Sequence, residues 1–268
     1  MSRRVLAVIA ICLAALPVAA RADDAKPGYW TVLIGGEGRI TPRWQGAKDN
    51  FIFVATPFLD VRTAGTPEPL YGARDGFGIA LFNMGGLRIG PVAKIRLPRK
   101  ESDDYQKLAG LGDIGTAYEA GVFVDYYWGR WLRLRTEVRQ GWGGHDGLAA
   151  DVTADLIGHI TPQLQLSGGP RISFASTRAT TPYFSITPSQ SVSSGLPVYD
   201  AKGGVRSVGA GGQVRYLWNP QWGTHVFVEY ERLTGDARNS PLITQRGTPD
   251  LWTFGFGVTY SFDMKALF

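Results

Sequence analysis

Hydrophobic and polar side chains alternate along most of this sequence with a period of two. In 131–139 one set of positions is largely apolar and the other is charged: Leu132, Leu134, Thr136 and Val138 against Trp131, Arg133, Arg135, Glu137 and Arg139. Successive side chains of a β-strand point to opposite faces, so the segment predicts a strand with one apolar and one ionised face. A soluble sheet buries its apolar face, whereas a membrane barrel turns that face outward.

The alternation recurs in segments whose lengths match the ~9–11 residues of a tilted membrane strand better than the ~5–6 of a soluble one. We predict eleven strands: 28–41, 50–62, 76–82, 86–97, 114–128, 131–143, 147–159, 163–176, 203–217, 222–234 and 251–262. Short turns alternate with the long polar loops 98–113, 177–202 and 235–250. This asymmetry is typical of outer-membrane barrels, which have short periplasmic turns and longer extracellular loops.

Eleven is an odd number, and bacterial single-chain barrels have an even number of strands. The alternation of short and long connections requires one more crossing before 76–82. Pro69–Ala73 can supply it, with Arg74-Asp75 as a turn. We therefore predict an all-β, antiparallel, up-and-down transmembrane barrel of twelve strands, with ten as the alternative.

The first 22 residues read as a cleaved secretory signal peptide. Arg3 and Arg4 precede an apolar stretch that ends at Ala19, and Ala20-Arg21-Ala22 fits the small-x-small cleavage rule. An uncleaved anchor is the alternative. We expect residues 23–268 to form a single barrel domain in the outer membrane of a Gram-negative cell. No later stretch is apolar enough for a spanning helix, which leaves a closed barrel as the way to cross a membrane.

Removing residues 1–22 changes what the composition implies. Cys12 is the one cysteine of the chain, so the mature protein has no disulfide, thiolate metal site or catalytic thiol. Three arginines also leave, which lowers the basic residues from 28 to 25 against 23 acidic ones. The sequence pI of 9.3 is therefore no argument for a nucleic-acid partner.

The charged face must line the lumen, because an Arg or Lys facing lipid near the midplane costs roughly 2–4 kcal/mol. The set would cost more than a protein's whole stability if it faced lipid. Its members are Glu37, Arg39, Arg88, Lys94, Arg96, Glu119, Asp125, Arg133, Arg135, Glu137, Arg139, Asp151, Asp155, Arg171, Arg215, Glu229 and Glu231. Both signs occur in similar number, which favours a structural salt-bridge network over a selective pore lining.

The histidines offer the other candidate chemistry. His145 and Asp146 lie in the glycine-rich tip 143–147, which we expect to be a tight hairpin. The alternative is a metal or ligand contact on the loop surface. His159 and His225 fall on the lumen face and are expected to join the charge network. The sequence indicates no metal site and no cofactor.

Several loop motifs carry a resemblance to a known family. They are Gly110-Leu111-Gly112-Asp113-Ile114, the run 139–147, Gly168-Gly169-Pro170-Arg171, Tyr183–Pro188, Ser194–Asp200 and Tyr230–Ala237. In this order and spacing, over nearly all of 28–262, the sequence resembles the MipA/OmpV family. The resemblance implies a Gram-negative outer-membrane β-barrel with outer-membrane lipid around it. One family member is a scaffold between a murein lytic transglycosylase and a bifunctional murein synthase, and none is established as an enzyme.

We accordingly expect a non-enzymatic scaffold that links murein-remodelling enzymes to the outer membrane. A small-solute channel is the alternative. A lipid-modifying enzyme is the second alternative, with His145, Asp146 and a serine of 185–194, or Ser173 with His159, as its catalytic groups. The loop 177–202 can begin a short helix, with Thr187 as N-cap and Pro188 as the first helical residue. A long loop of defined sequence often carries function, and the alternative is a lid that folds over the barrel mouth.

Overall fold

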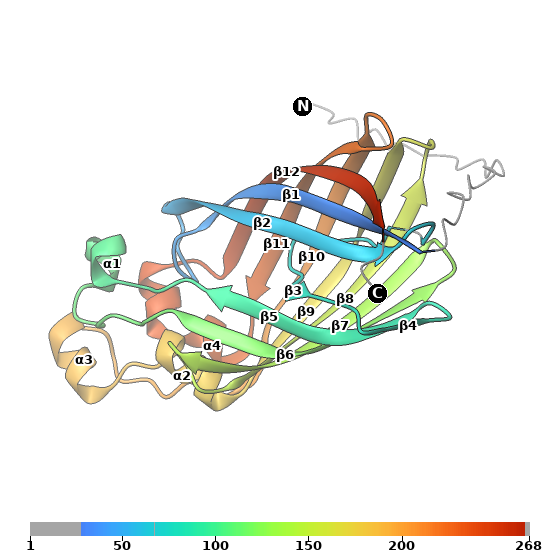
Figure 1. The fold of residues 1–268 in the computed structure, drawn as a ribbon. Coiled ribbons are helices and arrows are strands. Elements are labelled where there is room, and N and C mark those ends of the chain that lie inside the picture. Colours follow the sequence, from blue (N-terminus) through green and yellow to red (C-terminus); the bar gives the residue numbers. More distant parts are fainter. Residues whose placement is uncertain (1–27, 67, 266–268) are drawn as a thin grey trace, which may run out of the picture.

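The computed structural model describes residues 28–66 and 68–265, and the predicted signal peptide lies outside them. One antiparallel sheet curls around an interior, and short helices gather at one end (Figure 1). Its strands are β1 Tyr29–Pro42, β2 Phe51–Thr63, β3 Phe77–Gly78, β4 Phe82–Met84, β5 Leu87–Arg96, β6 Ala117–Trp128, β7 Leu132–Gly143, β8 Leu148–His159, β9 Leu164–Ala175, β10 Gly204–Leu217, β11 Trp222–Leu233 and β12 Asp250–Lys265. The predicted antiparallel barrel of twelve strands is confirmed as a fold class.

From β4 to β12, and for β1 and β2, neighbouring strands in sequence pair with each other; β3 pairs with β5, and β1 also pairs with β12, from Tyr29↔Lys265 to Ile40↔Phe254. The spatial order is therefore β2-β1-β12-β11-β10-β9-β8-β7-β6-β5-β3, with β4 also on β5. Within the described residues β2 and β3 are the two edges of the sheet.

The origin of the twelfth strand differs from the prediction. Residues 69–73 are not a strand, so that assignment was wrong; the predicted strand 76–82 is instead divided into β3 and β4. The division lies opposite Pro91 of β5, which has no backbone N–H to donate to the pairing strand.

The predicted extra crossing does occur, but inside the barrel. Between the end of β2 at Thr63 and the start of β3 at Phe77 lie residues 68–76, which we call the inner segment. Along the way the Leu70 amide donates to the Tyr127 hydroxyl at 3.1 Å, and the Gly76 amide donates to Glu137 at 2.9 Å. The crossing between β2 and β3 therefore follows from the even number of strands, whereas the path of this segment through the lumen does not.

The two ends of the barrel differ as expected. At one end tight turns join β4 to β5, β6 to β7, β8 to β9 and β10 to β11. At the other end the long loops carry the short helices η1 Glu101–Asp103, α1 Tyr105–Leu108, α2 Thr177–Phe184, α3 Pro188–Ser194, α4 Gly235–Asn239 and η2 Leu242–Arg246. No helix in the described part of the chain is long and apolar enough to span a bilayer.

Burial along the strands shows which face is inside. In β7 the buried side chains are Arg133, Arg135, Glu137 and Arg139, while Leu134 and Val138 between them are exposed. Exposed tryptophans mark both ends of the outer face: Trp128, Trp131, Trp218 and Trp222 beside the short turns, and Trp142 and Trp252 toward the long loops. An apolar outer band between two aromatic girdles is the surface of a barrel in a membrane.

Candidate functional site in the barrel lumen

Ion pairs line the lumen, and each of the seventeen charged residues assigned to it by the sequence has at least one partner of opposite charge. They come from eight of the twelve strands, β1 and β5 to β11, because each of these strands presents every second side chain inward. A network of both signs holds the wall together from strand to strand.

The most enclosed part of the network lies on β6, β7 and β8. Arg139 is 1% exposed and pairs with Glu119 at 2.9 Å, with Glu137 and with Asp151. Glu119 also receives the guanidinium of Arg96 at 2.8 Å. Because Arg139 meets three carboxylates and Glu119 meets two guanidinium groups, the buried charges compensate one another within the wall.

A second group centres on Arg133, which is also 1% exposed. Its guanidinium lies 2.7 Å from Asp75 and 3.0 Å from Asp125. Arg135 lies 2.9 Å from Asp125 and packs 4.2 Å from the centre of the Phe123 ring. Asp75 belongs to the inner segment, so this group joins the segment to the wall.

The remaining contacts of the inner segment hold it along its length. Arg74 pairs with Glu231 at 2.9 Å and donates to Ser173 at 3.0 Å, while Lys94 donates to its carbonyl oxygen at 2.8 Å. Glu68 lies 2.5 Å from Arg215. The segment thus fills the middle of the lumen and contacts opposite sides of the wall.

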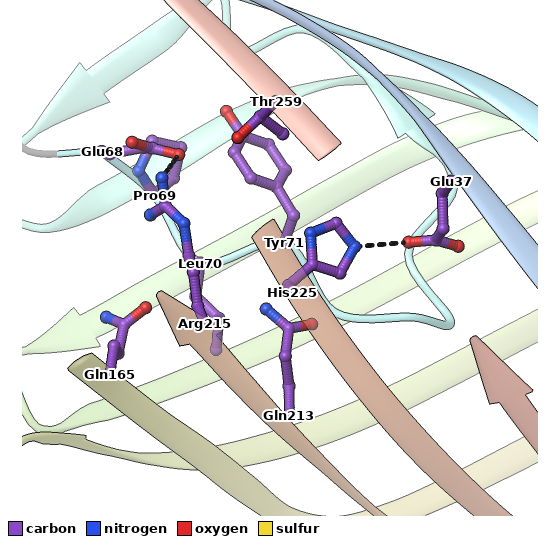
Figure 2. A pocket seen from close by; sticks show the side chains of 10 residues that line it. All are labelled: Glu37, Glu68, Pro69, Leu70, Tyr71, Gln165, Gln213, Arg215, His225 and Thr259. Atoms are coloured by element: carbon purple, nitrogen blue, oxygen red, sulfur yellow. Dashed lines mark hydrogen bonds and ion pairs between the residues drawn. The ribbon is translucent and has the colours of Figure 1, made fainter. Parts of the chain in front are cut away.

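A small polar cavity remains beside the inner segment, toward the short turns. Figure 2 shows the Glu68–Arg215 pair on one side of it and His225 pointing to Glu37 on the other, with Nε2 to Oε2 at 3.1 Å. Gln165 and Gln213 complete its lower wall (Figure 2). Its volume of about 20 Å³ holds roughly one water molecule.

The structure places the three histidines differently. His225 joins the network as predicted, whereas His159 is exposed and its Nε2 lies 3.3 Å from Gln165. His145 is 2% exposed, and its Nε2 lies 3.0 Å from Glu119. The alternative of a surface contact through the His145 side chain is therefore wrong, while Asp146 beside it is exposed.

The catalytic pairings drawn from the sequence are not assembled. Ser173 bonds Asp151 and lies opposite it in the β8–β9 register, whereas His159 lies at the other end of that strand pair. Ser185 accepts a hydrogen bond from the Ala201 amide, and His145 faces Glu119. Among the described residues no group of three or more His, Cys, Asp or Glu side chains could hold a metal ion.

The long loops form a hydrophobic cap over one end of the barrel. Trp44 from the β1–β2 loop, Leu108 from the β5–β6 loop, Phe184 from the β9–β10 loop and Leu242 from the β11–β12 loop belong to one buried cluster. The β5–β6 pair lies near the opposite edge of the sheet from β1–β2, so its loop meets the other three across the mouth, and α2, α3 and α4 lie there as well (Figure 1). The lid considered as the alternative for the loop 177–202 is thus present.

Local signals in the cap match the sequence. The Thr187 side chain accepts from the Gln190 amide, Pro188 is the first helical residue, and Gly195 ends α3 with φ 74°. Burial lowers the pKa of Arg99 to about 10, and its guanidinium donates to the Tyr183 carbonyl at 3.1 Å. Arg99 thus remains charged at neutral pH and ties the β5–β6 loop to α2.

Glu68, Arg74 and Asp75 are among the charged lumen residues missed by the sequence pattern, together with Arg206 of β10 and with Asp60 and Arg62 of β2, which pair with each other at 2.9 Å. The first three belong to the inner segment, where no alternation identifies an inward face. Arg206 pairs with Glu231 at 3.6 Å and lies at the start of β10, where the register with β9 shifts at a bulge. That shift removes the simple parity by which an inward residue is recognised.

A curled antiparallel sheet with an apolar outer band, two aromatic girdles and an ionised lumen defines an outer-membrane β-barrel protein. The chain belongs to the MipA family: the family model described as MltA-interacting protein MipA matches residues 34–262.

Solved structures of similar topology are bacterial outer-membrane barrels at low sequence identity. An outer membrane channel from Pseudomonas putida F1 is 10% identical, with a TM-score of 0.47 over 91% of this chain and 98% of that one. The NanC porin and the KdgM porin are each 10% identical, with TM-scores of 0.41 over 86% of this chain and 98% and 99% of theirs. No curated protein matches the sequence.

Proposed function

We propose that this protein is a closed, non-enzymatic outer-membrane scaffold that links murein-remodelling enzymes of the periplasm to the membrane. The observation that carries the proposal is the filled lumen: the inner segment and its ion pairs occupy the centre, and the cap covers one end. A barrel without an open lumen acts through its surfaces. The description of its family names an interaction with MltA, a murein transglycosylase, as the partner class.

The short-turn end of the barrel is the surface to which such a partner would bind. β1 begins and β12 finishes on this side of the barrel, where Tyr29 pairs with Lys265. This placement is consistent with export through a cleaved signal peptide and with a periplasmic orientation of the short turns. Exposed side chains lie on its turns, among them Arg130 between β6 and β7, and Trp218 and Gln221 between β10 and β11. These turns are short, so the partner has to dock on several of them together.

Affinity capture from detergent-solubilised envelopes tests this proposal. The tagged mature protein is expected to retain a murein transglycosylase or synthase, and Arg130→Glu together with Gln221→Glu is expected to weaken capture. The matched control is Gln106→Glu on α1, an exposed residue at the cap end. Absence of any murein enzyme from the captured material, with the barrel correctly folded, would overturn the scaffold assignment.

A small-solute channel is the second candidate, and the polar cavity of Figure 2 favours it. Its volume of about 20 Å³ is far below that of a sugar or amino acid, so a conducting state requires the inner segment to move. Planar-bilayer recording separates the two functions. Silence of the wild-type protein supports the closed scaffold, and frequent single-channel steps support the channel.

A further inference from the structure

The two edges of the sheet define a gap of particular geometry. β2 runs toward the short turns, since Thr63 at its end pairs with Trp30 at the start of β1. β4 also runs toward the short turns, since a two-residue turn joins it to β5. The edges β2 and β3–β4 therefore run parallel, and among the described residues no backbone hydrogen bond links them.

Unpaired backbone groups at a sheet edge are costly in hydrocarbon, where each unsatisfied group costs several kcal/mol. One strand antiparallel to both edges would satisfy them, and the inner segment, although not a strand in this structure, has the direction that such a strand needs. The inner segment runs from the short-turn end toward the cap, opposite to β2 and β4, and is joined to both. From Thr63 to Phe77 the chain exceeds the ~9–11 residues that a crossing needs.

The side chains of the inner segment suit that place. If Arg74 continues to face the lumen, period-two alternation also turns Leu70 and Gly72 inward and Pro69, Tyr71 and Ala73 toward lipid. Ala73, at 7% exposed, now lies buried in the lumen and would turn to lipid. Asp75 is the ionised residue that would have to leave the lumen, so its pairs with Arg133 and Arg135 act as the latch.

We propose that residues 68–76 are a movable additional strand of the wall. Latched by Asp75 they plug the lumen; released, they enter the wall between β2 and β3, complete an antiparallel barrel and open the lumen. This inference goes beyond the scaffold function, which rests on the latched state.

Site-directed spin labelling in lipid vesicles tests the proposal, and the absence of cysteine after residue 22 gives a clean background. Single cysteines at 69 to 74 are labelled in the wild-type background and with Asp75→Asn, which keeps the shape of the side chain and removes its charge. Asp49→Asn, in an exposed loop, is the matched control.

In the Asp75→Asn background, oxygen accessibility is expected to rise at 69, 71 and 73 and to stay low at 70, 72 and 74. The same change in accessibility is not expected with Asp49→Asn. A flat accessibility profile in a folded Asp75→Asn protein would overturn the proposal, since β2 and β3 would then be closing directly on each other. Loss of partner capture with normal alternation would instead concern the scaffold function alone.

Discussion

Asp75 and Arg133 join the inner segment to the barrel wall: a carboxylate oxygen of one lies 2.7 Å from a guanidinium nitrogen of the other. Arg133 is 1% exposed and also contacts Asp125 at 3.0 Å, so its single charge serves two carboxylates that come from different parts of the chain. A contact made across the lumen, rather than along one strand pair, couples the position of the inner segment to the stability of β6 and β7.

Arg133→Met is expected to lower the free energy of unfolding by about 3–5 kcal/mol, because it leaves buried carboxylates without their charge partner. Urea unfolding in lipid vesicles measures the change. The control is Arg232→Met, whose partner Asp250 is 36% exposed at the rim; solvent screens that pair, so its loss should change stability little. Equal losses of unfolding free energy in the two variants would show that the buried lumen pair stabilises the barrel no more than the exposed rim pair does.

Val138→Arg tests the orientation of the sheet. Val138 lies between Glu137 and Arg139 but is 47% exposed on the outer face, so an arginine there would meet lipid at a cost of about 2–4 kcal/mol. We expect reduced insertion, read from the heat-dependent gel mobility of the folded barrel. Val192→Arg on α3, where the side chain is 88% exposed in the cap, should insert normally. Normal insertion of both variants would argue against a lipid-facing Val138.

Gly257→Ala tests how the lumen makes room for His225. A Cβ at Gly257 would lie 2.2 Å from Cε1 of the His225 ring, so the ring would have to move away from Glu37. We expect a loss of about 1–3 kcal/mol in unfolding free energy, as for other overpacked sites. Gly36→Ala adds the same methyl group where nothing lies within 4 Å and should be nearly neutral in the same urea titration.

The sequence sufficed for the orientation of the wall because alternation over a long strand is an unambiguous pattern. Arg133, Arg135 and Arg139 cannot all face lipid, so their burial follows from parity alone. The path of Pro69–Ala73 did not follow, because a mixed segment this short fits a wall strand and a lumen plug equally well. The choice depends on Asp75 finding Arg133, a contact between residues that are distant in the sequence.

For the site residues too, the sequence predicts which side chains face inward but not which partner each one meets. Ion pairing of the seventeen wall charges was predictable as a class, whereas the individual partners depend on the register. The inward turn of His145 depends on Gly141, where a Cβ would lie 2.1 Å from the imidazole ring. A glycine in the sequence signals that a side chain is absent, but it does not show which neighbour occupies the space.

Phe184→Ala tests whether the cap is a separate cooperative unit. Phe184 is 1% exposed in the cluster that Trp44, Leu108 and Leu242 share, and loss of its ring is expected to cost the cap about 3–5 kcal/mol. Leu233 and Leu251, at the cap ends of β11 and β12, join this cluster, but the strands of the wall are held along their length by their own hydrogen bonds and lumen ion pairs. External protease should therefore cut the loop 177–202 faster in Phe184→Ala than in the wild type, while the gel mobility of the folded barrel is retained. Val192→Ala, at an exposed position of the same loop, should leave the cleavage rate unchanged. Loss of the folded barrel together with the cap would instead mean that the two fold as one unit, and that the cap takes part in holding the wall closed.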